Sequence, residues 1–419
     1  MVRIGVLGVG TVGRAVVEIL NENKEIITAR SGEEIVVKSG VVRDVSKIAD
    51  LDIMAGLDPY TLVNDPEIDI VVELMGGIEL PFELHKLALK NGKAVVTANK
   101  ALLAYHRYEL QEIAGNIPFE FEASVAGGIP IINALRDGLS ANHILSIRGI
   151  MNGTCNFMLS KMMKEGVCFD AVLSEAQSLG YAEADPTFDV GGFDAAHKLL
   201  ILASIAYGID AKPEEILIEG ITGVTQEDIS FAKEFGYTIK LLGIAKRDGS
   251  EVELRVHAAL VKNEEMIAKI DGVMNGISVV GDRVGETLYY GAGAGGNATA
   301  SAVVANIIDI VRSGKRSPML GFNHPLEEGL TLKNPDTIVS KYYLRLRITD
   351  KPGILAQITQ LFAGHTISVE AMIQRPSERE CTQLLFATHE TREYSIRNLI
   401  NDLEKLEAVL DTPYMIRIV

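Results

Sequence analysis

A cluster of charged side chains near the middle of the chain has the residue types needed to bind a small zwitterion and to move a proton. Glu183 and Asp189 lie in the Gly- and Pro-containing segment GYAEADPTFDVGG, which we expect to be a loop. Asp194 and Lys198 open an apolar run that predicts a helix, and a spacing of four places both on one helix face. An ordinary solvated loop with a surface ion pair would show the same pattern. This segment alone therefore leaves both interpretations open.

A glycine-rich turn near the N-terminus gives the second chemical signal. Residues 2–7 (VRIGVL) predict a buried strand, and GVGTVG and the helical run RAVVEIL follow directly. In this context Gly8 permits a tight turn, Gly10 lets the backbone approach a pyrophosphate, and Gly13 lets helix and strand pack closely. A diphosphate would then lie on the helix N-terminus. We therefore predict a dinucleotide cofactor, against the alternative of a Gly-rich turn that binds nothing.

The second strand of this unit, in IVVKSGVVRDVSK, bears on the choice between NAD and NADP. An acidic residue at the end of this strand holds the ribose hydroxyls, whereas a basic one suits a 2′-phosphate. The apolar part ends at Arg43, Asp44 follows it, and Lys47 comes one helical turn later. The basic residues favour NADP, and Asp44 keeps NAD open.

Two further strands bring side chains to the edge where such a cofactor binds. The first 125 or so residues alternate strand and helix patterns, which predicts a doubly wound α/β sheet. In open sheets of this kind, ligands lie outside the carboxyl ends of the strands. Thr97 and Lys100 follow the predicted strand KAVVTANK, so we expect Lys100 near the nicotinamide. An exposed lysine that merely opens the next helix is the alternative.

Length, charge and cysteine content limit the class of protein. The 419 residues suggest two or three domains, and 40 Lys and Arg against 56 Asp and Glu give a net charge of −16. This balance argues against a nucleic-acid or anionic-membrane partner. No apolar stretch has the length of a membrane span, no leader pattern opens the chain, and three cysteines lack disulfide or zinc spacing. We expect a cytoplasmic protein.

The strand and helix patterns predict three domains. Residues 1–130 form a Rossmann-type dinucleotide-binding domain, which an apolar helix over 297–313 completes. Residues 131–296 predict an α+β domain for substrate binding and dimerisation, and the Pro-containing residues 314–341 predict a linker. Residues 342–419 have the strand–helix–strand–strand–helix–strand order of a ferredoxin-like domain that could fold alone.

A turn of small residues joins the first two domains. In FEFEASVAGGIPIINALRDGL, a strand leads through this turn to a helix that Pro130 opens. Glu122 and the main-chain carbonyls after it could serve a hard monovalent cation, although composition alone predicts only a hinge.

Six segments occur in the order found in a known enzyme family. GVGTVG, TANKALL, EASVAGGIPII, MNGTCNFML, GYAEADPTFDVGGFDAAHKLLILA and GAGAGGNATASAVVANI together resemble homoserine dehydrogenase over residues 1 to about 320. The last 78 residues, with ITDKPGILAQIT and ISVEAMIQ, resemble an ACT domain, an amino-acid-sensing module. The resemblance implies reversible NAD(P)-dependent interconversion of L-homoserine and L-aspartate 4-semialdehyde, on the route to threonine, isoleucine and methionine.

The resemblance also implies roles for individual charged residues. Lys198 is the expected proton donor and acceptor, Asp189 an expected catalytic carboxylate, and Lys100 a rival proton relay. Glu183, Asp194 and Lys198 are the expected substrate-binding residues. Lys198 must be neutral to take a proton. Burial would lower its pKa and the neighbouring carboxylates would raise it, a balance that the sequence leaves open.

Cofactor and ion contacts are implied in the same way. The expected contacts of NADP or NAD are Gly8, Gly10, Thr11, Val12, Gly13, Arg43, Thr97, Lys100, Gly180 and Gly295. The resemblance turns the predicted hinge into a sodium site, formed by the Glu122 carboxylate and the main-chain carbonyls of Val125, Gly127 and Ile129.

Regulation and assembly follow from the resemblance to an ACT domain. Such domains commonly pair side by side and hold an amino acid near the turn after the first strand, here residues 350–355. We expect threonine, the end product of the pathway, as inhibitor and a homodimer or larger assembly. A pure dimerisation module is the alternative for this domain.

Two other classes of protein share part of this pattern. A semialdehyde or glyceraldehyde-type dehydrogenase would oxidise an aldehyde through a cysteine thioester, for which Cys155 is the candidate. A non-catalytic amino-acid sensor would keep the C-terminal domain, but the retained charged residues described above argue against it.

Overall fold

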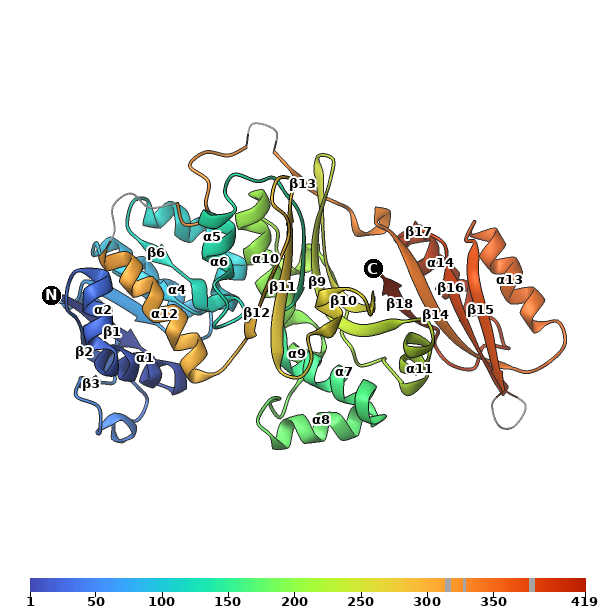
Figure 1. The fold of residues 1–419 in the computed structure, drawn as a ribbon, viewed down its shortest axis with the longest axis horizontal. Helices are drawn as coiled ribbons and strands as arrows, with labels where there is room; N and C mark the ends of the chain where they lie inside the picture. The colour runs from blue at the N-terminus through green and yellow to red at the C-terminus, as the bar shows by residue number, and fades with distance from the viewer. Residues whose placement is uncertain (313–317, 327–328, 377–380) are drawn as a thin grey trace.

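A computed structural model describes residues 1–312, 318–326, 329–376 and 381–419. Figure 1 shows three parts in a row, with the N-terminus at one end of the molecule and the ferredoxin-like part at the other. In the described ranges, no helix is long and apolar enough to cross a membrane.

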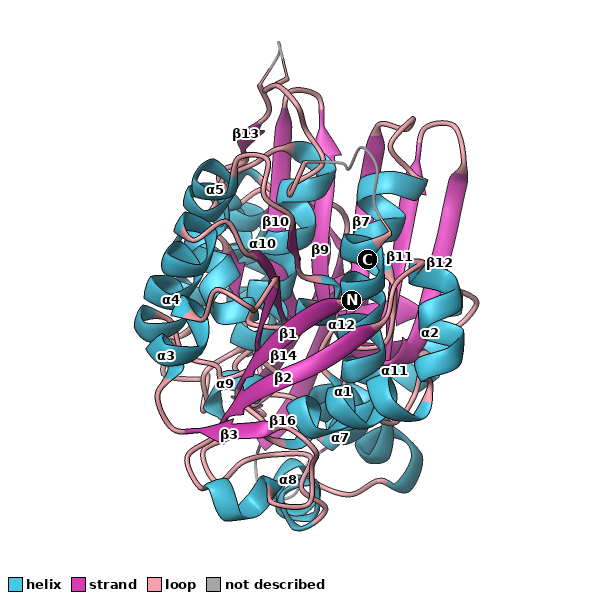
Figure 2. Cartoon of the chain, turned by 90° about the vertical axis from the view of Figure 1, so that its left-hand side faces the viewer, coloured by secondary structure: helices cyan, strands magenta, loops and turns pink. Residues whose placement is uncertain are grey.

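The N-terminal part is built on a parallel sheet with the strand order β3-β2-β1-β4-β5-β6. The bounds are β1 Val2–Leu7, β2 Ile35–Val41, β3 Met54–Gly56, β4 Ile70–Glu73, β5 Ala94–Thr97 and β6 Phe119–Glu120. Helices α1 (Thr11–Glu22) and α2 (Lys24–Ser31) lie on one side, and α3 (Pro59–Asn64), α4 (Glu79–Lys90) and α5 (Lys100–Ala114) on the other (Figure 2). The chain reverses its strand order at β1, as the predicted doubly wound fold requires.

Helix α12 (Gly296–Val311) returns to this part from far along the chain and packs against α1 (Figure 1). Its residues Val303 and Ile307 are fully buried with Ile4 and Val16 in one apolar cluster. A helix with so broad an apolar surface must be covered. The described helix corresponds to the predicted helix over 297–313, except that residue 313 lies outside the described residues.

The central part has a long antiparallel sheet against helix α10 (Phe193–Tyr207). Its main strands are β7 Ile144–Ile150, β9 Tyr237–Asp248, β10 Glu251–Lys262, β11 Met274–Gly281 and β12 Gly285–Ala292. The helices are α7 Gly153–Glu165, α8 Phe169–Ser178, α9 Thr187–Val190 and α11 Gln226–Glu234. The β9–β10 and β11–β12 hairpins turn at the Asp248-Gly249 and Gly281-Asp282 dipeptides, whose residue types favour turns.

The C-terminal part confirms the predicted order of elements. It consists of β14 (Val339–Thr349), α13 (Ile354–Gly364), β15 (Val369–Pro376), β16 (Cys381–Thr388), α14 (Glu393–Leu403) and β18 (Tyr414–Ile418), with a short β17 (Thr391–Arg392). Its sheet is not separate, because β18 pairs with β10 through Ala259↔Arg417 and Leu260↔Ile418. One sheet therefore runs from β12 to β15 in the order β12-β11-β7-β9-β10-β18-β14-β16-β15.

Three expectations differ from the structure in detail. Part of the predicted linker 314–341 is regular, since β13 (Thr331–Leu332) pairs with β10 and β14 already begins at Val339. The helix after Pro130 is one α-turn, Ile131–Asn133, followed by a π-helical turn to Gly138. The loop around Asp189 contains α9, because backbone bonds such as Val190 N to Pro186 O (2.9 Å) close a helical turn there.

Candidate active site

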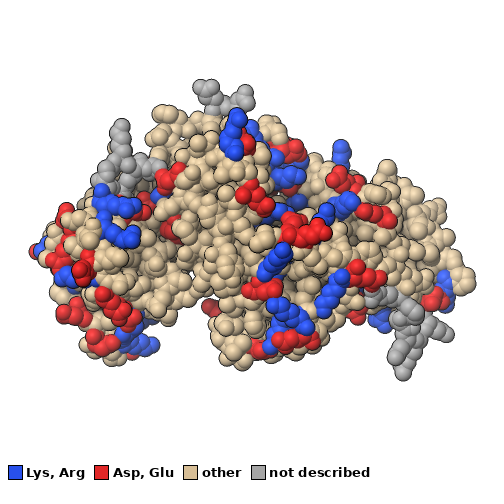
Figure 3. Space-filling view, in the orientation of Figure 1, with Lys and Arg blue, Asp and Glu red and all other residues tan. Residues whose placement is uncertain are grey.

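A cleft of about 650 Å³ separates the N-terminal and central parts, where Figure 3 shows a notch in the molecule. Parts of the chain far apart in sequence contribute to its walls. It is lined by the predicted residues Lys100, Gly180, Glu183, Asp189, Asp194, Lys198 and Gly295, and by Asn152. The structure thus brings the expected catalytic and substrate-binding groups into one cleft.

Asp194 holds both candidate proton-transfer lysines. Lys198 Nζ lies 2.7 Å from Asp194 Oδ2, and Lys100 Nζ lies 2.7 Å from Asp194 Oδ1. The spacing of four therefore produces the predicted pair on one face of α10. It is no surface pair, because Asp194 is 3% and Lys198 is 8% exposed. Lys198 Nζ also donates to the carbonyl of Met151 at 2.6 Å.

Burial and neighbouring charges shift the pKa values of Lys198 and Asp194. Burial lowers the pKa of Lys198, and its carboxylate neighbour Asp194 only partly offsets that effect. For Asp194 itself, burial would raise the pKa, but Lys198 and Lys100 outweigh burial and hold the pKa well below its usual range. The site thus keeps Asp194 as a carboxylate, and the lowered pKa gives Lys198 a larger neutral fraction than an exposed lysine has at the same pH.

Asn152 joins the two carboxylates and was not singled out by the sequence. Its Nδ2 donates to Asp189 Oδ1 at 2.7 Å and to Asp194 Oδ2 at 2.9 Å. Its Oδ1 accepts from Cys155 N at 2.8 Å, which caps α7 and fixes the orientation of the amide. Asn is a favoured residue at a helix N-cap, so its residue type was a usable signal for the cap, whereas the carboxylate contacts depend on the tertiary fold.

Asp189 and Glu183 reach the cleft from the segment that leads into α10. Asp189 is half-buried, and burial raises its pKa in spite of the hydrogen bond from Asn152. Glu183 is exposed in the wall of the cleft. The Thr154 hydroxyl donates to the carbonyl of Tyr181 at 2.5 Å and so ties this segment to α7.

The glycine-rich turn has the geometry that its spacing predicts. Gly8 adopts φ +96°, and a Cβ on Gly13 would lie 2.4 Å from Gly8 O. A Cβ on Gly10 would meet nothing within 4 Å, so the surface above this residue is open for a pyrophosphate. Thr11 and Val12 begin α1, and a Cβ on Gly296 would lie 3.4 Å from Thr11 O. The N-termini of α1 and α12, next to Gly295, therefore lie together.

The opposite end of this edge forms a pocket of about 810 Å³. The charged residues Arg43, Asp44 and Lys47 and the apolar residues Leu57 and Leu80 line it. One oxygen of Asp44 is engaged within the chain, since its Oδ1 accepts from Ser46 N (3.1 Å) and Ser46 Oγ (2.7 Å). Arg43 is exposed, and its side chain has no hydrogen-bond or ion-pair partner in the described residues.

Thr97 is the last residue of β5 and lies at the carboxyl ends of the strands, where the cofactor is expected. Its side chain is buried, its Oγ1 donates to Glu73 Oε2 at 2.8 Å, and it accepts from Asn99 N at 3.0 Å. The other oxygen of Glu73 accepts from Met75 N (2.7 Å) and Gly76 N (3.2 Å). The Thr97 hydroxyl thus shapes the turn after β4, and its predicted contact with the cofactor stays a prediction.

The predicted cation turn is buried beside the cleft. Glu122 accepts from Ile132 N (2.7 Å) and Asn133 N (2.8 Å), and burial raises its pKa to about 7. Val125 is buried, Gly127 has φ +51°, and Ile129 O accepts from Ile131 N at 2.8 Å. Between them Ala126 also has a positive φ of 54°. Two successive residues therefore have a positive φ in the turn where the expected cation ligands lie.

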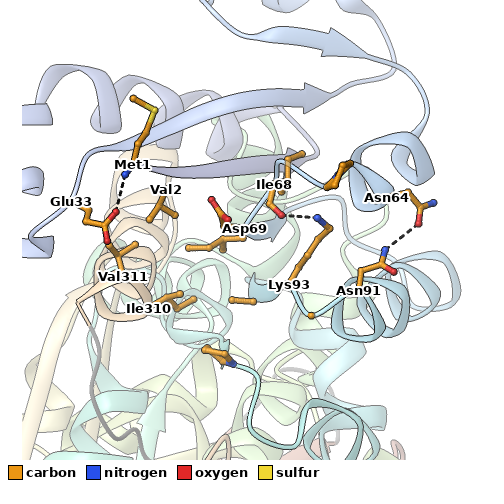
Figure 4. A pocket seen from close by; sticks show the side chains of 15 residues that line it. Met1, Val2, Glu33, Asn64, Ile68, Asp69, Asn91, Lys93, Ile310 and Val311 are labelled. Carbon is orange, nitrogen blue, oxygen red and sulfur yellow. Dashed lines mark hydrogen bonds and ion pairs between the residues drawn. The ribbon is translucent and has the colours of Figure 1, made fainter.

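Two other features carry no catalytic arrangement. Cys155 is fully buried, its Sγ donates to Asp189 O at 3.2 Å, and burial raises the pKa of its thiol, so it is a poor nucleophile. A hollow of about 850 Å³ lies at the amino ends of the parallel strands (Figure 4). Its charged groups are bonded within the chain: Met1 N to Glu33 (2.8 Å) and Lys93 Nζ to Ile68 O (2.6 Å).

Comparison with known proteins agrees with this geometry. The chain matches the homoserine dehydrogenase family over residues 130–308, the NAD-binding domain of homoserine dehydrogenase over residues 8–117, and the ACT domain over residues 342–408. It is 56% identical over 416 residues to a homoserine dehydrogenase of Helicobacter pylori, covering 99% of this chain and 98% of that protein.

Solved structures of homoserine dehydrogenases are similar as well. The crystal structure of the Thiobacillus denitrificans enzyme superposes with a TM-score of 0.93 at 46% identity, over 100% of this chain and 98% of that one. A hyperthermophilic archaeal homoserine dehydrogenase in complex with NADPH has a TM-score of 0.62 at 30% identity, over 74% of this chain and 97% of that one.

Proposed function

The chain belongs to the homoserine dehydrogenase family, and from this premise we propose that it interconverts L-homoserine and L-aspartate 4-semialdehyde with Lys198 as the proton-transferring group. It is an NAD(P)-dependent oxidoreductase that acts on a CH–OH group. The observation that carries the proposed role of Lys198 is its position in the cleft, buried, bonded to Asp194 and with a lowered pKa.

The division of labour follows from the charges in the cleft. When bound, the nicotinamide supplies the hydride acceptor for the carbinol carbon of homoserine. Neutral Lys198 takes the hydroxyl proton in that direction and returns it to the aldehyde oxygen in the other. Lys100 remains the rival relay, because Asp194 links it to Lys198 and its side chain is 36% exposed to solvent.

The carboxylates of the loop suit the ammonium group of the substrate. We assign this contact to Glu183 and to Asp189 Oδ2, since Asp189 Oδ1 already accepts from Asn152. Asp194 was predicted to bind substrate as well. Its oxygens already accept from Lys100, Lys198 and Asn152, so that direct contact stays a prediction and we assign Asp194 first to holding the lysines.

We assign NADP as the preferred cofactor. Arg43 and Lys47 offer cationic side chains at the pocket beside Leu57, whereas the competing Asp44 is bonded to Ser46. A 2′-phosphate suits such cations. The NADPH complex of the archaeal homoserine dehydrogenase supports this assignment. Gly10, Thr11, Val12 and Gly13 would hold the pyrophosphate through their main chain.

We also assign the Glu122 turn to a sodium ion. Glu122 is a buried carboxylate, 2% exposed, and its hydrogen bonds come from main-chain amides. A cation would neutralise this charge, and the carbonyls of Val125, Gly127 and Ile129 are the oxygen ligands that a hard ion prefers. The ion would stiffen the hinge and take no part in the chemistry.

We assign the C-terminal ACT domain to feedback regulation by threonine. The proposed reaction would lie on the route to threonine, isoleucine and methionine. The expected effector site is the turn between β14 and α13, residues 350–355, where Gly353 has φ +91°.

Homodimer formation is proposed at the ends of the long sheet, where the edge strands are β12 and β15. Val284 and Tyr290, near β12, are 47% and 59% exposed.

The test is homoserine-dependent reduction of NADP⁺ and NAD⁺ at alkaline pH, repeated with added L-threonine and with Cys155→Ser. Turnover in wild type and in Cys155→Ser supports the proposed reaction, and inhibition by threonine supports the regulatory assignment. Absence of turnover with homoserine would contradict the proposal. Loss of activity only in Cys155→Ser would point to thioester chemistry instead.

A further inference from the structure

Glu219 lies between the C-terminal domain and the catalytic segment, and its carboxylate belongs to neither site described above. Arg417 Nη1 donates to its Oε2 at 2.6 Å, and Arg397 Nη2 donates to its Oε1 at 2.7 Å. The same two arginines bind Glu393, which also accepts from the Tyr342 hydroxyl at 2.8 Å. Burial would raise the pKa of Glu219, but Arg417 and Arg397 outweigh it and lower the pKa.

The main chain beside Glu219 packs directly on the turn between Asp189 and Asp194. Ile221 N donates to Val190 O at 2.9 Å. A Cβ on Gly220 would lie 2.0 Å from Val190 O, and a Cβ on Gly192 would lie 3.0 Å from Glu219 O. The two backbones therefore touch without a side chain between them, and neither can shift alone.

This turn connects Asp189 with Asp194. Asp189 lies in α9, Gly192 caps α10 with φ +87°, and Asp194 is in the first turn of α10. Gly192 N donates to Asp189 O at 3.0 Å, and Ala196 N donates to Gly192 O at 3.0 Å. A change at Gly192 would therefore reach both Asp189 and the helix that carries Lys198.

From this geometry we infer that Glu219 is a positioning residue for the active site. Its ion pairs with Arg397 and Arg417 hold residues 218–221 against the catalytic turn, and through them the docking of the C-terminal domain sets the alignment of Asp189 and Asp194. The inference rests on the proposed reaction only for its activity readout, because the contacts themselves are independent of substrate.

Asp228 provides a matched control. It is a buried carboxylate of the central part that also binds the C-terminal domain, accepting from Arg345 Nε at 2.9 Å and from the Tyr343 hydroxyl at 2.8 Å. It lies on α11, and its Oδ2 accepts from the Thr225 main-chain N–H at 2.8 Å within the capping box of that helix. Loss of its charge should weaken the same docking, and the hydrogen bonds of Asp228 itself reach no residue of the segment 218–221.

The experiment compares Glu219→Gln and Asp228→Asn in the full-length protein, with Arg397→Gln as a milder variant should Glu219→Gln fail to fold. We expect kcat to fall by roughly tenfold or more in Glu219→Gln, because small misplacements of catalytic groups are costly. The KM for the cofactor should stay unchanged. Asp228→Asn should lower the melting temperature and leave kcat near the wild-type value. Hydrogen exchange should speed up at the amides of Gly191, Gly192 and Ala196 in Glu219→Gln only.

Equal changes of kcat and of exchange in both carboxylate variants, or no change in either, would overturn the inference. If wild type does not oxidise homoserine, the proposed function fails, and the exchange comparison still decides the role of Glu219. If wild type is active and exchange at the turn is unaffected by Glu219→Gln, the inference fails and the function stands.

Discussion

The two ends of the cofactor-binding edge differ in how far the chain itself satisfies their charges. At the catalytic end, Asp194, Lys198 and Asn152 are buried and bonded to one another. At the nucleotide end, Arg43 is exposed and has no side-chain partner in the described ranges. The catalytic groups are preorganised, so burial and their mutual charges set the pKa values of Asp194 and Lys198 before substrate arrives. We propose that a phosphate of the cofactor completes the charge at the nucleotide end.

The strongest test of this contrast removes the lysine of the preorganised end. We expect Lys198→Ala to lower kcat about 10²- to 10⁴-fold, the range for loss of a proton-transfer group. Lys240→Ala is the matched control, because Lys240 is also fully buried and paired, with Asp271 at 3.0 Å, outside the cleft. Steady-state kinetics on both folded variants make the comparison. A similar loss of kcat in both variants would mean that kcat falls because a buried lysine is removed, whether or not that lysine lies in the cleft.

Asn152→Ala sharpens the claim of preorganisation. The variant removes both donors between Asp189 and Asp194. Hydrogen bonds to charged groups contribute about 1.5–3 kcal/mol, so kcat/KM should fall roughly tenfold to a hundredfold. Asn156→Ala on the same helix is the control, since Asn156 Nδ2 donates to the carbonyls of Ile270 and Met274. Unchanged kcat/KM in Asn152→Ala would show that the carboxylates keep their positions without the amide.

At the nucleotide end, a substitution should change affinity and leave the chemistry alone. We expect Arg43→Ala to raise the KM for NADP⁺ roughly tenfold, by loss of a charge-assisted contact of about 1.5 kcal/mol, with kcat and the KM for NAD⁺ unchanged. Arg30→Ala, an exposed arginine on α2, serves as the control. An unchanged NADP⁺ preference in Arg43→Ala would refute the assigned role of Arg43.

The smallest effect is expected at the Glu122 turn, which we assign to a sodium ion. The pKa of Glu122 is raised to about 7 by burial, so the folded protein binds a proton there more tightly than the unfolded chain. Its contribution to stability is present below the ordinary pKa of about 4.3 and is lost as pH rises through the folded pKa. At pH 8, sodium chloride should therefore raise the melting temperature more than choline chloride does.

That sodium effect corresponds to about 1.4 kcal/mol when the ion is at ten times its Kd. The difference between the two salts should vanish in Glu122→Gln. Equal stabilisation by both salts in wild type would remove the sodium assignment and leave a buried carboxylate that titrates near neutrality.

The features that the sequence predicted well are local ones. The turn from Gly8 to Gly13 follows from three glycines in a strand–turn–helix context, and the Asp194–Lys198 pair follows from helical spacing. The missing features depend on long-range contacts. Asn152 meets Asp189 and Asp194 across 37 and 42 residues, and Arg417 meets Glu219 across 198. The hydrophobic periodicity of a sequence carries no information on contacts over such sequence separations. The continuous sheet and the contacts of Glu219 could therefore be found only from the structure.

The direction of the Lys198 pKa shift was a second point that needed the fold. The sequence shows the carboxylates that would raise this pKa but not the burial that lowers it. Burial depends on how α10 packs beneath the long sheet, where Lys198 is only 8% exposed. Local charge alone would have predicted the opposite shift.

The pH dependence of homoserine oxidation by wild type and Lys198→Ala tests the central claim most directly. In wild type, kcat/KM should rise with pH as Lys198 loses its proton, with an apparent pKa below the ordinary lysine value of about 10.4, and the reverse reaction should fall over the same range. This limb should be absent from the residual activity of Lys198→Ala. If the limb persists in Lys198→Ala and disappears in Lys100→Ala, proton transfer belongs to Lys100 and the assignment of Lys198 is contradicted.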